Sequence, residues 1–114
     1  MKNYLQPGDT ITATSPTGGL SSGEGAVVGA IFGVAAFDAA QGDEVELATR
    51  GVFELPKSAG VIAEGARVWW DDSGKTVENA SDTGLFPIGT CVGGAADAAA
   101  TCKVRLDGVA TVAA

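Results

Sequence analysis

Cys102-Lys103-Val104-Arg105-Leu106-Asp107 is the stretch of sequence that decides the fold. Its apolar residues alternate with charged ones, and this period of two is typical of a β-strand with one buried and one solvated face. Glu44-Val45-Glu46-Leu47 repeats the pattern in the first half of the chain. A Gly-Val pair follows each stretch, at Gly51-Val52 and at Gly108-Val109. The sequence therefore predicts a small β-scaffold built twice from similar hairpins.

Further short strands are expected on both sides of these segments, because turn-forming Gly, Pro, Asn and Asp residues recur roughly every 8–15 residues. The predicted strands cover residues 9–14, 26–36, 44–55, 66–70, 76–78, 86–92, 102–107 and 109–112. Pro87 cannot donate a main-chain hydrogen bond, which favours an edge position for its strand. The predicted fold class is all-β, a compact small β-barrel or β-sandwich of about seven to eight short strands.

A chain of 114 residues has the size of one domain, so residues 1–114 are expected to form a single β domain. Residues 1–7 show no apolar periodicity and end at Gln6-Pro7, which favours an extended backbone. We expect this segment to be a mobile N-terminal arm that could add a strand to a neighbouring protein.

Residues 26–36 are apolar at odd and even positions alike. Gly29, Gly33 and three valines favour a strand over a helix here, and that strand would be apolar on both faces. A single small sheet would leave one of the faces in water, so a second layer or another subunit must cover it. Candidate interface residues in this segment are Val27, Val28, Ile31 and Phe32.

Trp69 and Trp70 are consecutive, so in a strand their side chains point to opposite faces. One of them is expected in the core. The other is either an ordinary surface residue or an interface contact, since tryptophan is enriched at interfaces. Both therefore join the candidate interface residues.

The net charge of −7, from 14 acidic and 7 basic residues, disfavours nucleic acid and anionic membranes as partners. No stretch approaches the roughly 20 apolar residues of a membrane span, and residues 1–7 lack the apolar core of a signal peptide. We expect the protein to be made and kept in a cytoplasm. The sequence predicts no basic or metal-binding cluster, so binding is expected to use apolar and backbone groups around the sheet edges and to depend weakly on salt.

An enzyme is disfavoured because the chain has no histidine, and therefore no Ser-His or Cys-His pair. The adjacent carboxylates Asp71 and Asp72 precede Ser73-Gly74 and are interpreted as turn formers. No segment has the spacing of a calcium loop or a phosphate loop, so no cofactor, metal or small-molecule substrate is expected. Cys91 and Cys102 are interpreted as free buried thiols in a cytoplasm, with a disulfide formed after release as the alternative.

Several segments occur in an order that points to a family. They are Gln6-Pro7-Gly8-Asp9 before a Thr-rich strand, Gly42-Asp43-Glu44-Val45-Glu46-Leu47, Gly51-Val52-Phe53-Glu54-Leu55-Pro56-Lys57, Gly65-Ala66-Arg67-Val68-Trp69-Trp70-Asp71, Ile88-Gly89 and Val104-Arg105-Leu106. This order resembles the small capsid cement, or head decoration, proteins of tailed bacteriophages and prophages. The paired cysteines and the Ala-rich connector of residues 93–100 are not counted among the shared features.

The resemblance implies a compact all-β structural protein of the virion. Such a protein binds the exterior of an icosahedral shell through the major capsid protein and stabilises the assembled capsid, commonly as a homotrimer and without a cofactor. A non-catalytic β binding module for carbohydrate or peptide is the alternative function, and an exposed aromatic platform around Trp69 or Trp70 would favour it.

Overall fold

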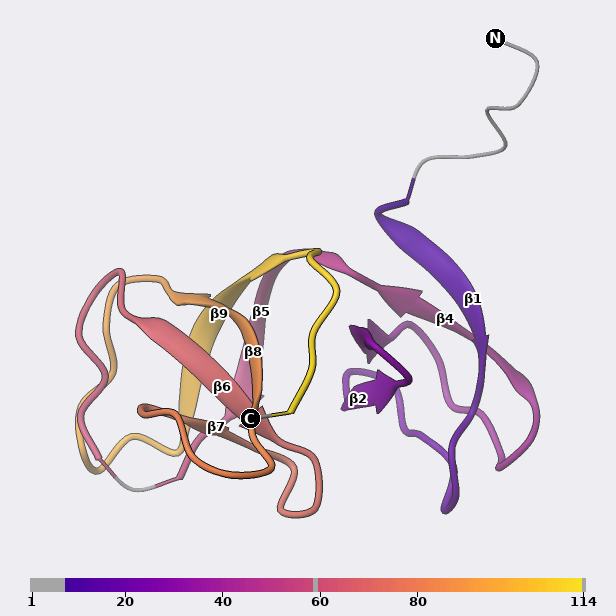
Figure 1. Cartoon of the computed structure of the whole chain (residues 1–114), viewed down its shortest axis with the longest axis horizontal. Helices are drawn as coiled ribbons and strands as arrows, with labels where there is room; N and C mark the ends of the chain where they lie inside the picture. The colour runs from indigo at the N-terminus through magenta and orange to yellow at the C-terminus, as the bar shows by residue number, and fades with distance from the viewer. Residues whose placement is uncertain (1–7, 59, 114) are drawn as a thin grey trace, which may run out of the picture.

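The computed structural model describes residues 8–58 and 60–113. These residues form nine strands in two antiparallel sheets and no helix, which confirms the all-β prediction (Figure 1). The strands are β1 (Thr10–Thr14), β2 (Gly25–Val28), β3 (Ile31–Ala35), β4 (Glu44–Ala48), β5 (Arg50–Pro56), β6 (Arg67–Asp71), β7 (Thr76–Glu78), β8 (Phe86–Cys91) and β9 (Thr101–Asp107). The predicted arm, residues 1–7, lies outside the described residues, and the single domain stays a prediction.

The first sheet has four strands in the order β1-β4-β3-β2. In the β1–β4 pair, Thr12 lies opposite Glu46 and Ala13 lies opposite Val45. Because directly opposed residues share a face, the threonines of β1 stand beside the glutamates of β4, on the side away from the apolar residues.

The second sheet has five strands in the order β5-β9-β8-β6-β7 and curls into a small barrel. Its two edges meet just after β5, where a parallel bridge joins Lys57 to Val77 and the Ser58 amide donates to the Val77 carbonyl at 3.1 Å. Closure protects strand edges that would otherwise be open to pairing with other chains.

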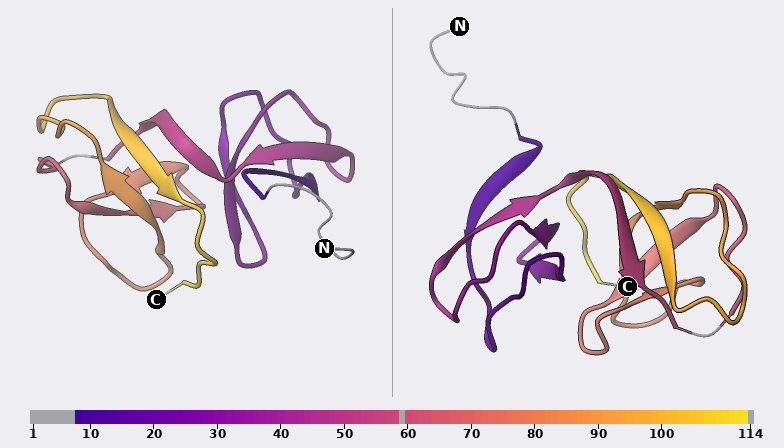
Figure 2. Two further views of the ribbon diagram at one scale, coloured as in Figure 1. Left: turned by 90° about the horizontal axis from the view of Figure 1, so that it is seen from above. Right: turned by 180° about the vertical axis from the view of Figure 1, so that it is seen from behind.

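The segment 44–55, predicted as one continued strand, is two strands that belong to different sheets. β4 ends at Ala48 and β5 begins at Arg50, and Figure 2 shows the chain passing from one sheet to the other at this point. Gly51, expected at a bend, has φ of 120°, a backbone conformation that residues other than glycine rarely adopt. The prediction of a single strand was wrong because apolar and polar residues keep alternating where the chain passes between the sheets. The sequence pattern therefore does not show the break between β4 and β5.

The doubly apolar segment 26–36 is also not a single strand. It is the hairpin β2–β3, whose turn contains Gly29 at φ of 61°. One face of the hairpin contributes Ala26 and Ala35 to a smaller core, and the other contributes Phe32 and Val34 to a larger core. The chain's own two sheets therefore cover both faces, so this segment no longer requires a second subunit.

The larger core fills the barrel and extends to the face of the β2–β3 hairpin that carries Phe32 and Val34, and the smaller core lies under the four-stranded sheet. The buried residues of the larger core are Phe32, Val34, Leu55, Ile62, Val68, Trp70, Val77, Ile88, Cys91, Cys102, Val104 and Leu106. Those of the smaller core are Leu20, Ala26, Ala35, Val45 and Leu47. Phe32 of β3 meets Trp70 of β6 with ring centroids 5.2 Å apart at an interplanar angle of 58°, a favourable tilted geometry that joins the two sheets.

Two further predictions need correction. Pro87 does not lie on an edge strand, because β8 is paired with β9 on one side and with β6 on the other. The strand tolerates proline because the β6–β8 register shifts between Val68 and Trp69, next to the proline. Residues 109–112 form no strand; Thr111 is instead buried, its amide donating to Ala30 O at 2.8 Å and its hydroxyl to Pro87 O at 2.7 Å.

Candidate interaction surface

The predicted interface residues of the β2–β3 hairpin occupy three kinds of environment. Phe32 is buried in the larger core, Val27 and Val28 are half-buried, and Ile31 is 38% exposed. Ile31 lies with Val109 at the wall of a shallow cavity of about 300 Å³ between the hairpin turn and the C-terminal segment. Of these four residues, Ile31 offers the most surface to a partner, and its role in an interface stays a prediction.

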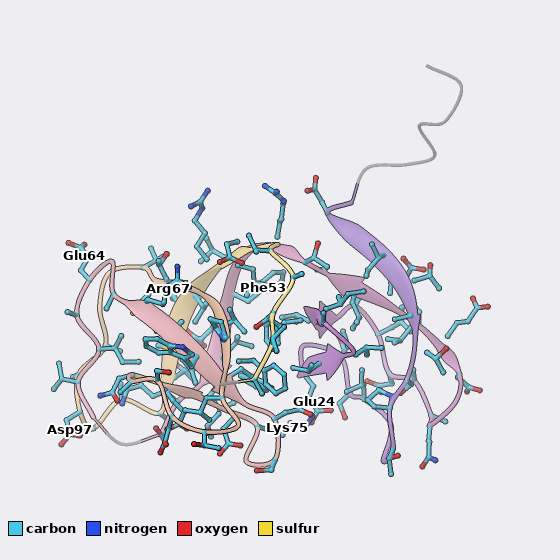
Figure 3. The ribbon with its side chains drawn as sticks, viewed as in Figure 1. Glu24, Phe53, Glu64, Arg67, Lys75 and Asp97 are labelled. Carbon is cyan, nitrogen blue, oxygen red and sulfur yellow. The ribbon has the colours of Figure 1, made fainter. Side chains whose placement is uncertain are left out.

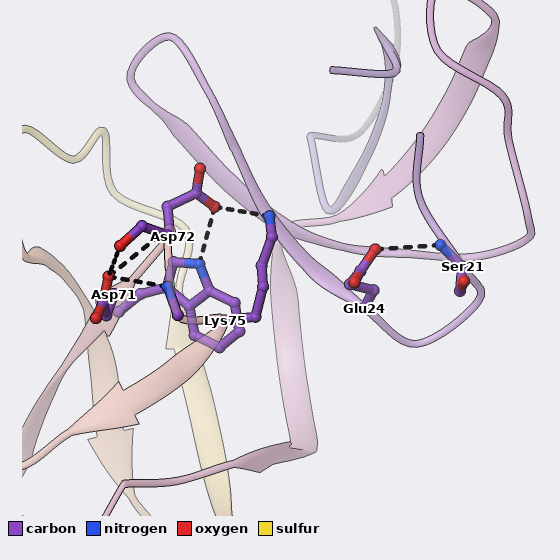
Figure 4. A network of polar contacts seen from close by, with 8 residues as sticks. Ser21, Glu24, Asp71, Asp72 and Lys75 are labelled. Carbon is purple, nitrogen blue, oxygen red and sulfur yellow. Dashed lines mark hydrogen bonds and ion pairs between the residues drawn. The ribbon is translucent and has the colours of Figure 1, made fainter. Parts of the chain in front are cut away.

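The two tryptophans separate as the strand geometry requires. Trp70 is 1% exposed and packs in the larger core, while Trp69 is half-buried on the outer side of β6. The Trp70 indole nitrogen donates to the Asp72 carboxylate at 3.1 Å, and Lys75 Nζ contacts the same oxygen at 3.1 Å (Figure 4). Trp70 is therefore a core residue whose indole N–H has a hydrogen-bond acceptor, Asp72, at the end of β6.

Asp71 is a turn former, as expected. Its Oδ1 accepts hydrogen bonds from the Ser73 hydroxyl at 2.8 Å and from the amides of Ser73 and Gly74 at 3.1 and 3.2 Å (Figure 4). The Ser73 hydroxyl bond and then the Gly74 amide bond lower the pKa of the Asp71 carboxyl below its usual value. Such a carboxylate stays ionised and serves the turn rather than proton transfer.

The outer side of the barrel carries most of the cations that the sequence scatters. On β9, Cys102, Val104 and Leu106 point into the core, so Lys103 and Arg105 point outward. Arg105 lies opposite Val52 of β5, and Lys103 opposite Glu54. Val52 is an apolar residue among these charged side chains and is 54% exposed.

A row of outward residues crosses four strands of the barrel. Val52 of β5 is opposite Arg105 of β9, Arg105 is opposite Thr90 of β8, and Thr90 is opposite Arg67 of β6. With neighbouring strands about 4.8 Å apart, the backbones of Arg105 and Arg67 are separated by about 10 Å. Figure 3 shows Arg67 among the side chains of the barrel's outer surface. We call this surface the basic face, defined by Arg50, Arg67, Lys103 and Arg105.

Most cations of the basic face lack an anionic partner. The structure pairs Arg50 with Asp9 at 3.4 Å, with both side chains well exposed, and Lys75 with Asp72 at 3.1 Å. Arg67, Lys103 and Arg105 make no ion pair within the described part of the chain. Glu54 and Asp107 also lie on this side, which leaves the face with a surplus of positive charge.

The four-stranded sheet has the opposite character. Residues 8–49 contain six carboxylates and neither lysine nor arginine. Glu44 and Glu46 project from β4 on the side turned away from the smaller core, next to Thr14 and Thr12. Thr12 donates its hydroxyl to the Glu46 carboxylate at 2.5 Å. We call this surface the acidic face, defined by Glu44 and Glu46.

One lysine and the two cysteines are buried within the fold. Lys57 is 7% exposed and donates to the carbonyls of Ser58 and Asp97 at 2.9 and 3.3 Å. Cys91 and Cys102 are both buried free thiols, as expected from the sequence. Burial, and then the nearby Cys91 sulfur, raises the pKa of Cys102 to about 11, which makes it a poor nucleophile.

No group of three or more histidine, cysteine or acidic side chains within residues 8–58 and 60–113 is arranged to hold a metal ion. The same residues include no helix long and apolar enough to cross a membrane.

The expectation that the protein has no basic cluster was wrong. The prediction that binding depends weakly on salt rested on that expectation and loses its reason. Arg67 and Arg105 are 38 positions apart in the chain, and the pairing of β6, β8 and β9 brings them into one row. The alternation of Lys103 and Arg105 was visible in the sequence. The partner strands were not, because register depends on which strands pair and not on local pattern.

Comparison with known proteins identifies the family. A model of the phage cement protein family matches residues 5–106, which is most of the chain and includes β1 to β8 and all of β9 except its last residue, Asp107. No curated protein matches the sequence. The matched region contains both the basic and the acidic face. The chain therefore belongs to the phage cement protein family.

Proposed function

We propose that this protein binds the outer surface of a phage capsid and stabilises the assembled shell. The observation that carries the proposal is the match of residues 5–106 to the phage cement protein family. The partner is the major capsid protein, the location is the exterior of the virion, and synthesis takes place in the bacterial host cytoplasm.

The character of the described surface supports a passive binding role. The polar groups at the turns and in the barrel serve the fold, and the ionisable side chain with the largest shift in pKa, Cys102, is buried. A cement protein needs neither a nucleophile nor a cofactor, because it acts through contacts with an assembled lattice. We propose accordingly that the protein is not an enzyme.

We further propose that the protein acts as a homotrimer. A closed ring of identical subunits lets one chain contact several capsid subunits at once, and linked contacts raise avidity without new types of contact. The proposed N-terminal arm, residues 1–7, lies two residues before the edge strand β1 in the sequence and could add a strand to a capsid subunit.

The experiment is uptake onto shells. Purified protein is mixed with undecorated, expanded capsids of its own phage and, separately, with unassembled capsid subunits, and bound protein is measured by co-sedimentation. Saturable binding to shells and none to subunits is expected, with electron microscopy locating the added density outside the shell. Absence of binding to expanded shells would reject the proposal.

A carbohydrate- or peptide-binding module gains little support from the surface. Trp70 is buried in the core, and Trp69 is half-buried. Phe86 packs against the larger core and does not extend an aromatic surface around Trp69. One partly exposed ring offers a small stacking area, so this function remains the second choice.

A further inference from the structure

We propose that copies of this chain associate head to tail, with the basic face of one copy on the acidic face of the next. The inference rests on the proposed homotrimer for the size of the assembly but not on capsid binding. It names the two surfaces that meet and the electrostatic reason that they do.

The basic face has the features of one half of a contact. Arg67, Lys103 and Arg105 make no ion pair in the described part of the chain, and the strand pairing holds them at fixed spacing. Val52, 54% exposed beside Arg105, supplies apolar surface between the charges. A partner that brings carboxylates to this face gains both ion pairs and the burial of Val52.

The chain itself supplies such a surface. The segment 8–49 carries six carboxylates and no cation, so its charge is opposite to that of the basic face. Glu44 and Glu46 stand two residues apart on one side of β4, the same spacing as Lys103 and Arg105 on β9. Residues two apart in a strand project about 6.5–7 Å from each other, so the two pairs match in separation.

The two faces belong to different sheets and cannot meet within one chain in this way. In the barrel the cations lie on β5, β9 and β6, whereas the acidic face lies on β1 and β4 of the other sheet. A contact between unlike surfaces is heterologous, and it leaves one free basic face and one free acidic face in any open assembly. A closed ring satisfies both, and a ring of three is the homotrimer proposed above.

The test uses two charge-reversed variants of the full chain. Lys103→Glu/Arg105→Glu makes the basic face acidic, and Glu44→Lys/Glu46→Lys makes the acidic face basic. Analytical ultracentrifugation at low salt, up to a concentration of about 1 mM, is expected to show association of the wild-type protein. Each variant alone should associate at least about tenfold more weakly, because like charges then meet. An equimolar mixture of the two variants should regain association as mixed dimers and open chains, since each contact between one variant and the other is again between opposite charges. A closed ring of three should not be regained, because two variants cannot alternate around it and one of its contacts stays like-charged.

A matched control separates the proposed contact from net charge. Glu64→Lys/Asp82→Lys changes the charge by the same amount as Glu44→Lys/Glu46→Lys, at exposed acids outside both faces, and should associate like the wild type. Association should also weaken as sodium chloride is raised, because exposed charges are screened beyond about 3 Å at 1 M. Circular dichroism of each variant verifies that it is folded.

Three results would overturn the proposal. They are a wild-type protein that stays monomeric at about 1 mM in low salt, association that salt does not weaken, and a variant mixture that does not associate. A monomer that still binds shells, and loses that binding on Lys103→Glu/Arg105→Glu, would assign the basic face to the capsid instead. Failure of shell uptake with intact head-to-tail association would reject the proposed function and leave this contact standing.

Discussion

At the scale of single residues, Gly89 shows how a family pattern becomes a packing requirement. Ile88-Gly89 is one of the segments in which the chain resembles the cement proteins. In the structure, a Cβ added at Gly89 would overlap the carbonyl oxygen of Arg105 and approach the Leu106 Cα at 3.3 Å. The neighbouring strand's backbone occupies the space, so β8 and β9 can pair closely only where residue 89 lacks a side chain.

Gly89→Ala is therefore expected to destabilise the protein by about 1–3 kcal/mol or more, because backbone atoms of β9 would have to move. Chemical denaturation followed by tryptophan fluorescence measures the change. Gly8→Ala is the control, since nothing lies within 4 Å of an added Cβ there, and its effect should stay within about 0.5 kcal/mol. Equal effects of the two substitutions would contradict the close approach of the strands.

Cys102 predicts a pH dependence in the alkaline range. Burial raises its thiol pKa from 9.0 to about 11, so the unfolded chain releases this proton at lower pH than the folded protein does. Between these values the native state binds more protons than the unfolded state, and the free energy of unfolding falls as pH rises. The contribution is fully present below pH 9.0 and is lost above about 11.

The measurement compares wild type with Cys102→Ala in denaturant unfolding across this range. All other side chains are the same in both proteins, so the difference in slope isolates the thiol. The variant is expected to lose less stability than wild type between pH 9.0 and about 11. Parallel curves would show that the thiol is not buried as described.

At the scale of elements, the C-terminal segment joins the two sheets. Thr111 is 2% exposed; its amide donates to Ala30 O in the turn of the β2–β3 hairpin, and its hydroxyl donates to Pro87 O in β8. With the Phe32–Trp70 contact, this makes a second connection between the four-stranded sheet and the barrel. The segment lies beyond the family match at residues 5–106, so it is a feature of this chain that the family match does not cover.

Thr111→Val tests this connection. It keeps the shape and the amide bond but removes the hydroxyl, which leaves the Pro87 carbonyl without this donor at a cost of about 1–2 kcal/mol. Thr111→Ser keeps the hydroxyl and is the control, expected to stay closer to wild type. Urea denaturation of the three proteins gives the comparison, and a Thr111→Val protein as stable as Thr111→Ser would show that the bond contributes nothing.

Local alternation was enough to predict most strands and the all-β class, because period-two patterns report which face is buried. Val104 and Leu106 pointed inward as expected, and Asp71 formed its turn. The sequence could not reveal that Arg50 begins a strand of a different sheet from Ala48, since no local feature distinguishes a crossing from a bend. It also concealed the basic face, because Arg67 and Arg105 meet only through the order of strands in the barrel.

At the scale of the whole molecule, the charged side chains are unevenly distributed. Residues 8–49 contribute six carboxylates without a cation, while residues 50–114 contain eight carboxylates and six cations, four of which form the basic face. The basic face and the acidic face are therefore surfaces of opposite charge on one molecule, as the proposed head-to-tail contact requires. Its contacts should therefore respond to salt, contrary to the expectation from the sequence.

The most direct test of the central claim is the heat stability of the phage shell. Protein in hundredfold excess over its dissociation constant stabilises each occupied site by about 2.7 kcal/mol, and many sites act on one particle. Undecorated expanded capsids are heated with and without the protein, and disruption is followed by light scattering or calorimetry. A cement protein raises the disruption temperature, and the rise saturates with occupancy. An unchanged disruption temperature at full occupancy would contradict the claim that this protein stabilises the capsid.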